Sequence, residues 1–367
     1  MKRNIHGGEH GGENITRDFS ININPLGIPE NVMRKLYSDR ECFEVYPDTG
    51  CSDLTRALSY ETGISPNRIV CGNGASDLIY RICQCFNIKK AIIPVPAFSE
   101  YERAVRQNGG IAEYIYTSKE SGYIPVANDF SNYEKKHYGC KSGMEDESGM
   151  KCDGRTAVFL CNPSNPSGKV CSREVIKAAE RFCSRTGAVL IIDECFIQFT
   201  HMHEEKPECL QGCESIVLRA FTKIYAMAGL RLGYAICSSA KSADMLRAWG
   251  SPWSVSGPAQ KAGVEALHAE GYIEKTVKYV ENQRRFLYEN LEDMGLEYIP
   301  SDANYILFEA PYGLDRSMQE YGIAIRDCSD YEGLEAEHGR KYFRIAVRTE
   351  EENRYLCEIM RRCLKWL

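Results

Sequence analysis

Short apolar runs alternate with helical patterns over the central part of the chain, and this alternation restricts the fold more than any other feature. Strands are predicted at residues 68–71, 90–94, 157–161, 189–193, 215–219 and 233–237. After the first of these runs, Leu78, Ile82 and Phe86 recur at the spacing of one helix face. Strands that alternate with helices are typical of a parallel sheet covered by helices. We therefore predict an α/β fold with a mostly parallel sheet.

The pattern changes after about residue 258. Helical stretches fill residues 259–294, and strand-like segments follow at residues 304–308, 323–327 and 342–347. Thr349 and Glu352 form a predicted capping box that opens a last amphipathic helix. This change predicts a smaller α+β domain after the α/β part.

The change of pattern also divides the chain into two predicted domains. The large domain covers residues 35–257, and the smaller one combines residues 258–367 with an N-terminal arm at residues 1–34. Residues 135–155 are rich in Gly, Ser and charge and have no apolar periodicity. We expect an exposed loop there rather than a linker between domains.

Charge and hydropathy exclude several classes of protein. Lys plus Arg number 45 against 51 for Asp plus Glu, so the net charge is -6 and nucleic acid is not an expected partner. The longest apolar runs, such as residues 188–192, are far shorter than the ~20 residues of a membrane span. The polar start resembles no secretory signal, which predicts a cytoplasmic protein. The chain has 17 Cys, an odd number, and they form no paired zinc-type motifs, so we expect reduced thiols.

Two turns at predicted strand ends carry ligand-binding signals. The sequence GNGAS at residues 72–76 joins a strand to a helix, and NPSNPSG at residues 162–168 closes another strand. Glycines let the backbone approach a ligand closely, and the free N–H groups of a helix start suit a phosphate. A merely tight connection would look the same, and no third glycine completes a dinucleotide fingerprint. The second turn lies at the carboxyl edge where α/β proteins bind ligands.

Three charged residues follow in order along the chain. Asp193 ends the core strand at residues 189–193, where a carboxylate is costly unless it has a partner. Lys223 follows the next strand, and a lysine in an apolar setting can attack an aldehyde. Arg231 comes shortly afterwards. Together with the phosphate turn and Asn165, these residues match the groups that pyridoxal phosphate requires.

With these residues in this order, the chain resembles the fold type I pyridoxal-phosphate enzymes over nearly its whole length. The resemblance implies that Lys223 forms the Schiff base with pyridoxal 5'-phosphate and that Asp193 pairs with the pyridine nitrogen. It also implies that Asn165 donates to the phenolate oxygen and that the ring of Phe98 stacks on the cofactor.

The resemblance further implies how the cofactor phosphate is held and how the subunits assemble. Phosphate binding would fall to Ala75, Ser76, Thr222 and Arg231. The family forms homodimers with shared active sites, in which Tyr46 would reach the site of the partner subunit.

Several short segments narrow the resemblance to the threonine-phosphate decarboxylases. They are HGG at residues 6–8, DFSININPLG at 18–27, IRDCS at 325–329 and FRIAVR at 343–348. Phe196 stands where transaminases of the histidinol-phosphate type usually have a Tyr. The implied substrate-binding residues are His6, Asn24, Arg326, Arg344 and Arg348.

The arginines support a doubly anionic substrate without the resemblance. On a strand, Arg344 and Arg348 would point to one face, and Arg326 would come from a neighbouring strand. Planar guanidinium groups suit both a carboxylate and a phosphate. Surface salt bridges are the alternative role for these side chains. His6 or His10 is a further candidate for the phosphate, unless the terminus is disordered.

The function expected from the sequence is the pyridoxal-phosphate-dependent decarboxylation of L-threonine O-3-phosphate to (R)-1-aminopropan-2-yl phosphate in cobalamin biosynthesis. The alternative is a class I/II aminotransferase acting on histidinol phosphate or a related amine. A pyridoxal-phosphate sensor fused to a DNA-binding domain is disfavoured by the net charge of -6. A zinc site at His201, His203, Cys209 and Cys213 is conceivable, but the expected chemistry requires no metal and none is predicted.

Overall fold

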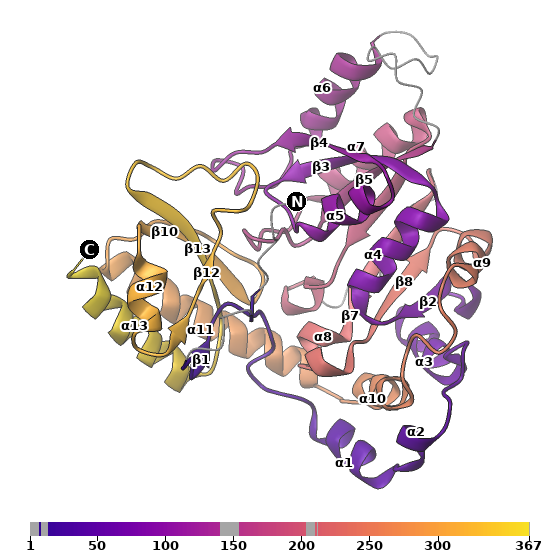
Figure 1. Ribbon diagram of the computed structural model, residues 1–367, viewed down its shortest axis with the longest axis horizontal. Helices are drawn as coiled ribbons and strands as arrows, with labels where there is room; N and C mark the ends of the chain where they lie inside the picture. The colour runs from indigo at the N-terminus through magenta and orange to yellow at the C-terminus, as the bar shows by residue number, and fades with distance from the viewer. Residues whose placement is uncertain (1–6, 9–13, 140–153, 203–209, 211, 367) are drawn as a thin grey trace.

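A seven-stranded mixed sheet forms the centre of the protein (Figure 1). The computed structural model describes residues 7–8, 14–139, 154–202, 210 and 212–366. The strand order is β2-β8-β7-β6-β5-β3-β4. The strands are β2 (Ile69–Gly72), β3 (Ile88–Val95), β4 (Ile111–Tyr116), β5 (Arg155–Cys161), β6 (Val189–Asp193), β7 (Ser215–Ala220) and β8 (Gly233–Cys237). Only β8 in this sheet runs against its neighbours, so the predicted mostly parallel sheet is confirmed.

The sequence predicted every strand of this sheet except β4. That strand lies at the edge of the sheet and pairs only with β3. Its end residues Ile111 and Tyr116 are 46% and 62% exposed. A strand with one open edge and exposed ends shows no continuous apolar run, which is why the pattern missed it.

The sheet is buried on both faces. In β6, Val189 and Ile191 belong to one hydrophobic cluster, whereas Leu190 and Ile192 belong to another. Successive side chains of a strand point to opposite faces, so this division shows two cores, one on each side of the sheet. The covering helices are α4 (Gly74–Cys85), α5 (Glu100–Gln107), α6 (Ala127–Tyr138), α7 (Arg173–Thr186), α9 (Ala240–Ala248) and the short α8 (Phe221–Ile224).

The loop predicted at residues 135–155 begins later than expected. Helix α6 continues to Tyr138, and residues 140–153 lie outside the described part of the chain. Tyr133 stacks on His137, and Tyr138 packs edge-on against Phe182 of α7. These ring contacts stabilise the last helical turn, although the absence of apolar periodicity in residues 135–155 predicted a loop there.

A second, antiparallel sheet has the order β12-β13-β10-β9. Its strands are β9 (Tyr298–Ile299), β10 (Tyr305–Pro311), β12 (Arg326–Asp327) and β13 (Arg340–Ala346). Helices α11 (Tyr272–Asp293), α12 (Leu314–Gln319) and α13 (Glu350–Leu364) lie beside it (Figure 1). The single strand predicted at residues 323–327 is two strands, because β11 (Ile323–Ala324) pairs instead with the N-terminal β1 (Arg17–Asp18).

The remaining helices are α1 (Glu30–Ser38), α2 (Glu41–Glu44), α3 (Ser52–Thr62) and α10 (Gly257–Leu267), and α1, α2 and α3 all contact α10. Within the described ranges, no helix combines the length and apolar character that crossing a membrane would require. The domain bounds given above stay a prediction.

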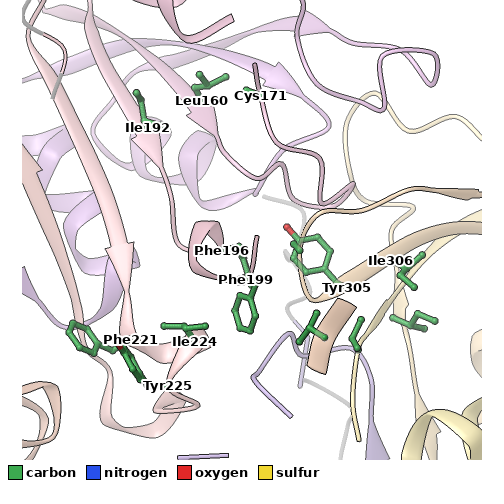
Figure 2. Packing of buried hydrophobic residues seen from close by; sticks show 14 of the residues in the cluster. Leu160, Cys171, Ile192, Phe196, Phe199, Phe221, Ile224, Tyr225, Tyr305 and Ile306 are labelled. Carbon is green, nitrogen blue, oxygen red and sulfur yellow. The ribbon is translucent and has the colours of Figure 1, made fainter. Parts of the chain in front are cut away.

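One hydrophobic cluster joins the two sheets (Figure 2). Ile192 lies on the seven-stranded sheet, and Tyr305 lies on β10 of the smaller sheet. Phe196 lies between them and meets the Tyr305 ring edge-on at 5.0 Å between centroids. The Tyr305 hydroxyl also donates to the backbone oxygen of Ser164 at 2.8 Å. The turn after β5 is therefore fastened to the smaller sheet.

The predicted capping box at α13 is confirmed. The Thr349 hydroxyl oxygen accepts from the Glu352 amide at 3.4 Å, and Glu352 Oε2 accepts from the Thr349 amide at 3.2 Å. Thr349→Ala should lower the free energy of unfolding by about 1 kcal/mol, because helix N–H groups lose their acceptor. Urea unfolding followed by circular dichroism measures this change. Thr349→Ser keeps the oxygen and should stay close to the unmodified protein; equal losses in both variants would contradict the capping role.

Candidate functional site

A cavity opens where β5, β6 and β7 end, at the carboxyl edge of their parallel run. Ten of the predicted cofactor- and substrate-binding residues line it: Ala75, Ser76, Phe98, Asn165, Asp193, Thr222, Lys223, Arg231, Arg326 and Arg344. They come from both sheets, from the helices α4 and α8, and from connecting loops. The fold thus brings together residues that lie up to 269 positions apart, from 75 to 344.

One end of the cavity is built to hold an anion. Helix α4 begins at Gly74, and Ala75 and Ser76 in its first turn line the wall. Gly74 has φ +80°, and a Cβ added there would lie 2.7 Å from Nη2 of Arg231. A larger residue would therefore displace the guanidinium group from the helix start. A helix N-terminus beside an arginine suits a phosphate, as the sequence predicted for this turn.

Asp193 lies buried at the end of β6 and is held at both carboxylate oxygens. The Tyr101 hydroxyl donates to Oδ2 at 2.6 Å, and the Cys195 amide donates to Oδ1 at 3.0 Å. Burial raises the pKa of Tyr101 well above its usual value, with the Asp193 charge adding to the effect, so the phenol stays a neutral donor. The sequence analysis did not assign a role to Tyr101, although its neighbour Phe98 was singled out. The carboxylate is fixed in orientation and faces the cavity.

Lys223 extends into the cavity from the short helix α8. Burial, together with the nearby Arg344 and Arg231 cations, lowers the pKa of its amine to about 8. Its Nζ lies 6.0 Å from the centroid of the Phe196 ring. Phe196 cannot donate a hydrogen bond, so this wall is apolar. Near neutral pH the neutral form of this amine is therefore more populated than that of an ordinary lysine, which favours attack on an aldehyde.

Asn165 and Arg344 form the opposite wall. Arg344 Nη1 donates to Asn165 Oδ1 at 2.5 Å, and Nη2 donates to the backbone oxygen of Ser20 at 2.9 Å. Tyr331, which the sequence analysis missed, also donates to Asn165 Oδ1, at 3.3 Å. These bonds occupy the amide oxygen, and Nδ2 of Asn165 has no partner among the described residues. The side chain is therefore oriented to donate to a ligand through its nitrogen.

Asn24, a predicted substrate-binding residue, does not line the cavity. Asn24 is buried and donates to the Ile224 backbone oxygen and to Thr276 Oγ1, so it fastens the N-terminal segment to α8 and α11. Its neighbour Asn22 lines the cavity instead, and its buried Oδ1 has no hydrogen-bond partner. Sequence alone could not separate the two, because alternation on an extended segment puts both on one face.

The prediction that Arg344 and Arg348 point to one face of a strand is wrong for Arg348. Strand β13 ends at Ala346, so residue 348 no longer follows the alternation that places Arg344 at the cavity. Its Nη2 donates to Glu352 Oε1 at 2.7 Å in the first turn of α13. Arg348 therefore belongs to a salt bridge at a helix start, the alternative considered for these arginines.

Tyr46 does not line the cavity. Tyr46 is 81% exposed and packs against Trp253 at 4.7 Å between ring centroids, and its predicted reach into a partner subunit stays a prediction. His6 and His10 lie outside the described residues, although the neighbouring Gly7 lines the cavity. His203 and Cys209 of the conceivable zinc set lie outside them as well. Within the described ranges, no group of three possible metal ligands occurs.

The cavity fits pyridoxal phosphate. It offers an anion cradle at Gly74 and Arg231, a fixed carboxylate, an amide donor and an amine with a lowered pKa. The buried Oδ1 of Asn22 has no hydrogen-bond partner and can accept a hydrogen bond from a ligand.

Known proteins resemble this chain over nearly its full length. A family model described as aminotransferase class I and II matches residues 15–360. Threonine-phosphate decarboxylase from Salmonella typhimurium is 30% identical over 352 residues, which are 95% of this chain and 91% of that protein. Histidinol-phosphate aminotransferase 2 from Carboxydothermus hydrogenoformans is 30% identical over 369 residues, which cover 95% of this chain and 93% of that protein.

The fold is also known from solved structures. The crystal structure of the histidinol-phosphate aminotransferase from Clostridium acetobutylicum has a TM-score of 0.81 to this chain at 25% identity, and covers 96% of this chain and all of that one. These comparisons confirm the fold class and the resemblance that the sequence motifs indicated.

The pKa of Lys223 predicts how the cofactor-free protein reacts. Acetylation of Lys223, followed by mass spectrometry, should speed up with pH through a midpoint of about 8, because only the neutral amine reacts. Arg344→Gln removes a cation that favours the neutral amine, so the midpoint should move to higher pH. Exposed Lys241 serves as an internal reference for the reagent. A midpoint that stays in place or falls in the variant would contradict this electrostatic coupling.

Proposed function

The chain belongs to the aminotransferase class I and II family, and on this premise we propose that it decarboxylates L-threonine O-3-phosphate. The proposed product is (R)-1-aminopropan-2-yl phosphate, with a place in cobalamin biosynthesis. Pyridoxal 5'-phosphate is the cofactor of this family. When bound, it supplies an acceptor for the electron pair released when a bond to the substrate α-carbon breaks.

The observation that carries the proposal is the presence of two guanidinium groups beyond the one in the phosphate cradle. Arg326 and Arg344 line the same cavity as Arg231, and both are buried. Buried cations at a ligand cavity favour a substrate with matching negative charges. A phosphorylated amino acid has a phosphate and a carboxylate, one for each of these arginines.

Several residues would hold the cofactor. Lys223 would bind its aldehyde, Asp193 would keep its pyridine nitrogen protonated, and Asn165 would donate to its phenolate oxygen through Nδ2. Its phosphate would lie at the start of α4, bound by Ala75, Ser76, Thr222 and Arg231, and Phe98 would pack on its ring. All of these side chains line the cavity.

Positioning by the arginines would decide which bond breaks. The orientation of the substrate α-carbon would determine which of its bonds breaks, so the way Arg326 and Arg344 hold the two anionic groups would select the reaction. Lys223 Nζ would then return a proton to the α-carbon, for which a pKa of about 8 is suitable. The apolar Phe196 wall would exclude water beside this nitrogen.

The runner-up is an aminotransferase acting on histidinol phosphate or a similar phosphorylated amine. It is favoured by the relative from Carboxydothermus hydrogenoformans, which is as similar in sequence as the decarboxylase. A transaminase would need an oxoacid as second substrate, whereas a decarboxylase would not.

This difference provides the first experiment. The protein loaded with cofactor is incubated with L-threonine O-3-phosphate, with and without 2-oxoglutarate, and carbon dioxide and glutamate are measured. We expect carbon dioxide without the oxoacid, and none from Lys223→Ala, which lacks the amine. Glutamate without carbon dioxide would reject the decarboxylase in favour of the aminotransferase, with histidinol phosphate as the next substrate to test.

Arg344 should contribute strongly to substrate binding. Arg344→Ala is expected to raise the KM for the phosphorylated substrate about tenfold or more, because a hydrogen bond to a charged group contributes ~1.5–3 kcal/mol. Arg348→Ala is the control, since its side chain pairs with Glu352 outside the cavity. The visible absorbance of the bound cofactor shows whether each variant keeps its fold. An unchanged KM in Arg344→Ala would place the carboxylate site elsewhere.

A cytoplasmic homodimer with shared active sites is part of the proposal. Phe43, Val45 and Tyr46 are all more than half exposed in succession along one short segment. An apolar surface of this kind is suited to contact with a second subunit.

A further inference from the structure

Arg326 is already paired with an acid of its own chain. Both carboxylate oxygens of Asp330 accept from Nη2 of Arg326, at 2.8 and 2.7 Å. The other terminal nitrogen, Nη1, donates to the backbone oxygen of Asp327. The guanidinium carbon lies 5.4 Å from the centroid of the Tyr331 ring. The terminal nitrogens are thus directed at the turn that follows β12.

The two members of this pair differ in their surroundings. The Arg326 side chain is 9% exposed and lines the cavity, whereas the Asp330 side chain is 33% exposed and does not line it. The Asp330 carboxylate can therefore exchange the ion pair for water, whereas the buried Arg326 guanidinium group cannot. An anion that enters the cavity would replace the carboxylate as the partner of the buried cation.

Arg344 provides the contrast within the same cavity. Its terminal nitrogens donate to Asn165 Oδ1 and to the Ser20 backbone oxygen, both of which are neutral acceptors, and its Nε is buried without a partner. Its charge is therefore available to a ligand, while the charge of Arg326 is neutralised until Asp330 leaves.

We propose that Asp330 is an internal counter-ion that the second anionic group of the substrate displaces from Arg326. Asp330 is then a specificity-determining residue: it weakens the binding of every ligand that requires Arg326 and does not affect ligands that require only Arg344. A strongly charged phosphate can displace it, whereas an amino acid without a second anion leaves the pair closed. The inference rests on the proposed function only in taking a substrate with two anionic groups.

The opposite role for Asp330 would be to hold Arg326 in its binding position. The two roles predict opposite signs. Removing a competitor strengthens the binding of phosphate, whereas removing a positioning residue weakens it. Asp330→Asn separates them, because the amide keeps the size of the side chain and loses its charge.

The experiment is a calorimetric titration of the cofactor-loaded protein with inorganic phosphate. Asp330→Asn should lower the Kd for phosphate about fivefold, the effect of losing one partly exposed ion pair. Arg326→Gln should raise the Kd, and adding Asp330→Asn to Arg326→Gln should cause no further change. Titration with L-threonine, followed by the absorbance of the bound cofactor, should give the same Kd in Asp330→Asn as in the unmodified protein.

Glu332→Gln is the matched control. It removes one negative charge two residues further along the same turn, and its amide can keep the hydrogen bond with the Tyr116 hydroxyl, 2.8 Å in the protein. Its Kd for phosphate should not change. A Kd that rises or stays the same in Asp330→Asn, or one that falls equally in Glu332→Gln, overturns the proposal. None of these titrations depends on which reaction the protein catalyses, so they stand apart from the carbon dioxide assay.

Discussion

The hydrogen bonds of Arg344 connect the parts of the chain on which the site depends. Its side chain starts on the smaller sheet, donates to the backbone of the N-terminal segment at Ser20, and donates to Asn165 in the turn after β5. Burying the terminal nitrogens of a guanidinium group without acceptors is costly, so the geometry that brings Ser20 and Asn165 to Arg344 is favoured. The same contacts orient the Asn165 amide towards the cavity. The contacts that pack the two sheets together therefore also position the residues of the site.

The apolar contacts between the sheets support that geometry. Phe196, just after β6, packs against Tyr305 of β10 (Figure 2). The Tyr305 hydroxyl donates to the backbone of the turn that carries Asn165. Phe196 also forms the apolar wall beside Lys223. One ring therefore takes part both in the core that joins the sheets and in the environment that lowers the pKa of the amine.

More basic than acidic side chains line the cavity. The basic side chains Lys223, Arg231 and Arg344 line it against the acids Asp193 and Glu100, while Arg326 has its counter-ion outside the wall at Asp330. An excess of positive charge in a partly buried cavity is costly unless anions or lowered pKa values offset it. The lowered pKa of Lys223 is one such response, and the fit to two phosphates and a carboxylate is another.

The sequence by itself determined much of the fold and the family to which the chain belongs. Periodicity predicted six strands of the central sheet and the capping box of α13, because burial on both faces and local hydrogen bonding leave direct patterns in neighbouring residues. The order of glycines, Asn165, Asp193, Lys223 and Arg231 indicated the family, since the cofactor requires those groups. Edge strand β4 and the last turn of α6 left no such pattern, because edge pairing and ring contacts across helices stabilise them.

Tertiary structure alone decided which of several similar residues face the cavity. Asn22 rather than Asn24, and Arg344 but not Arg348, line it, because the course of the backbone at β13 and the partners on α8, α11 and α13 determine where each side chain points. The roles of Tyr101, Tyr331 and Asp330 likewise depend on contacts with Asp193, Asn165 and Arg326. Sequence specifies which chemical groups are present, whereas their distances and burial, and hence their charges, arise only when the two sheets pack together.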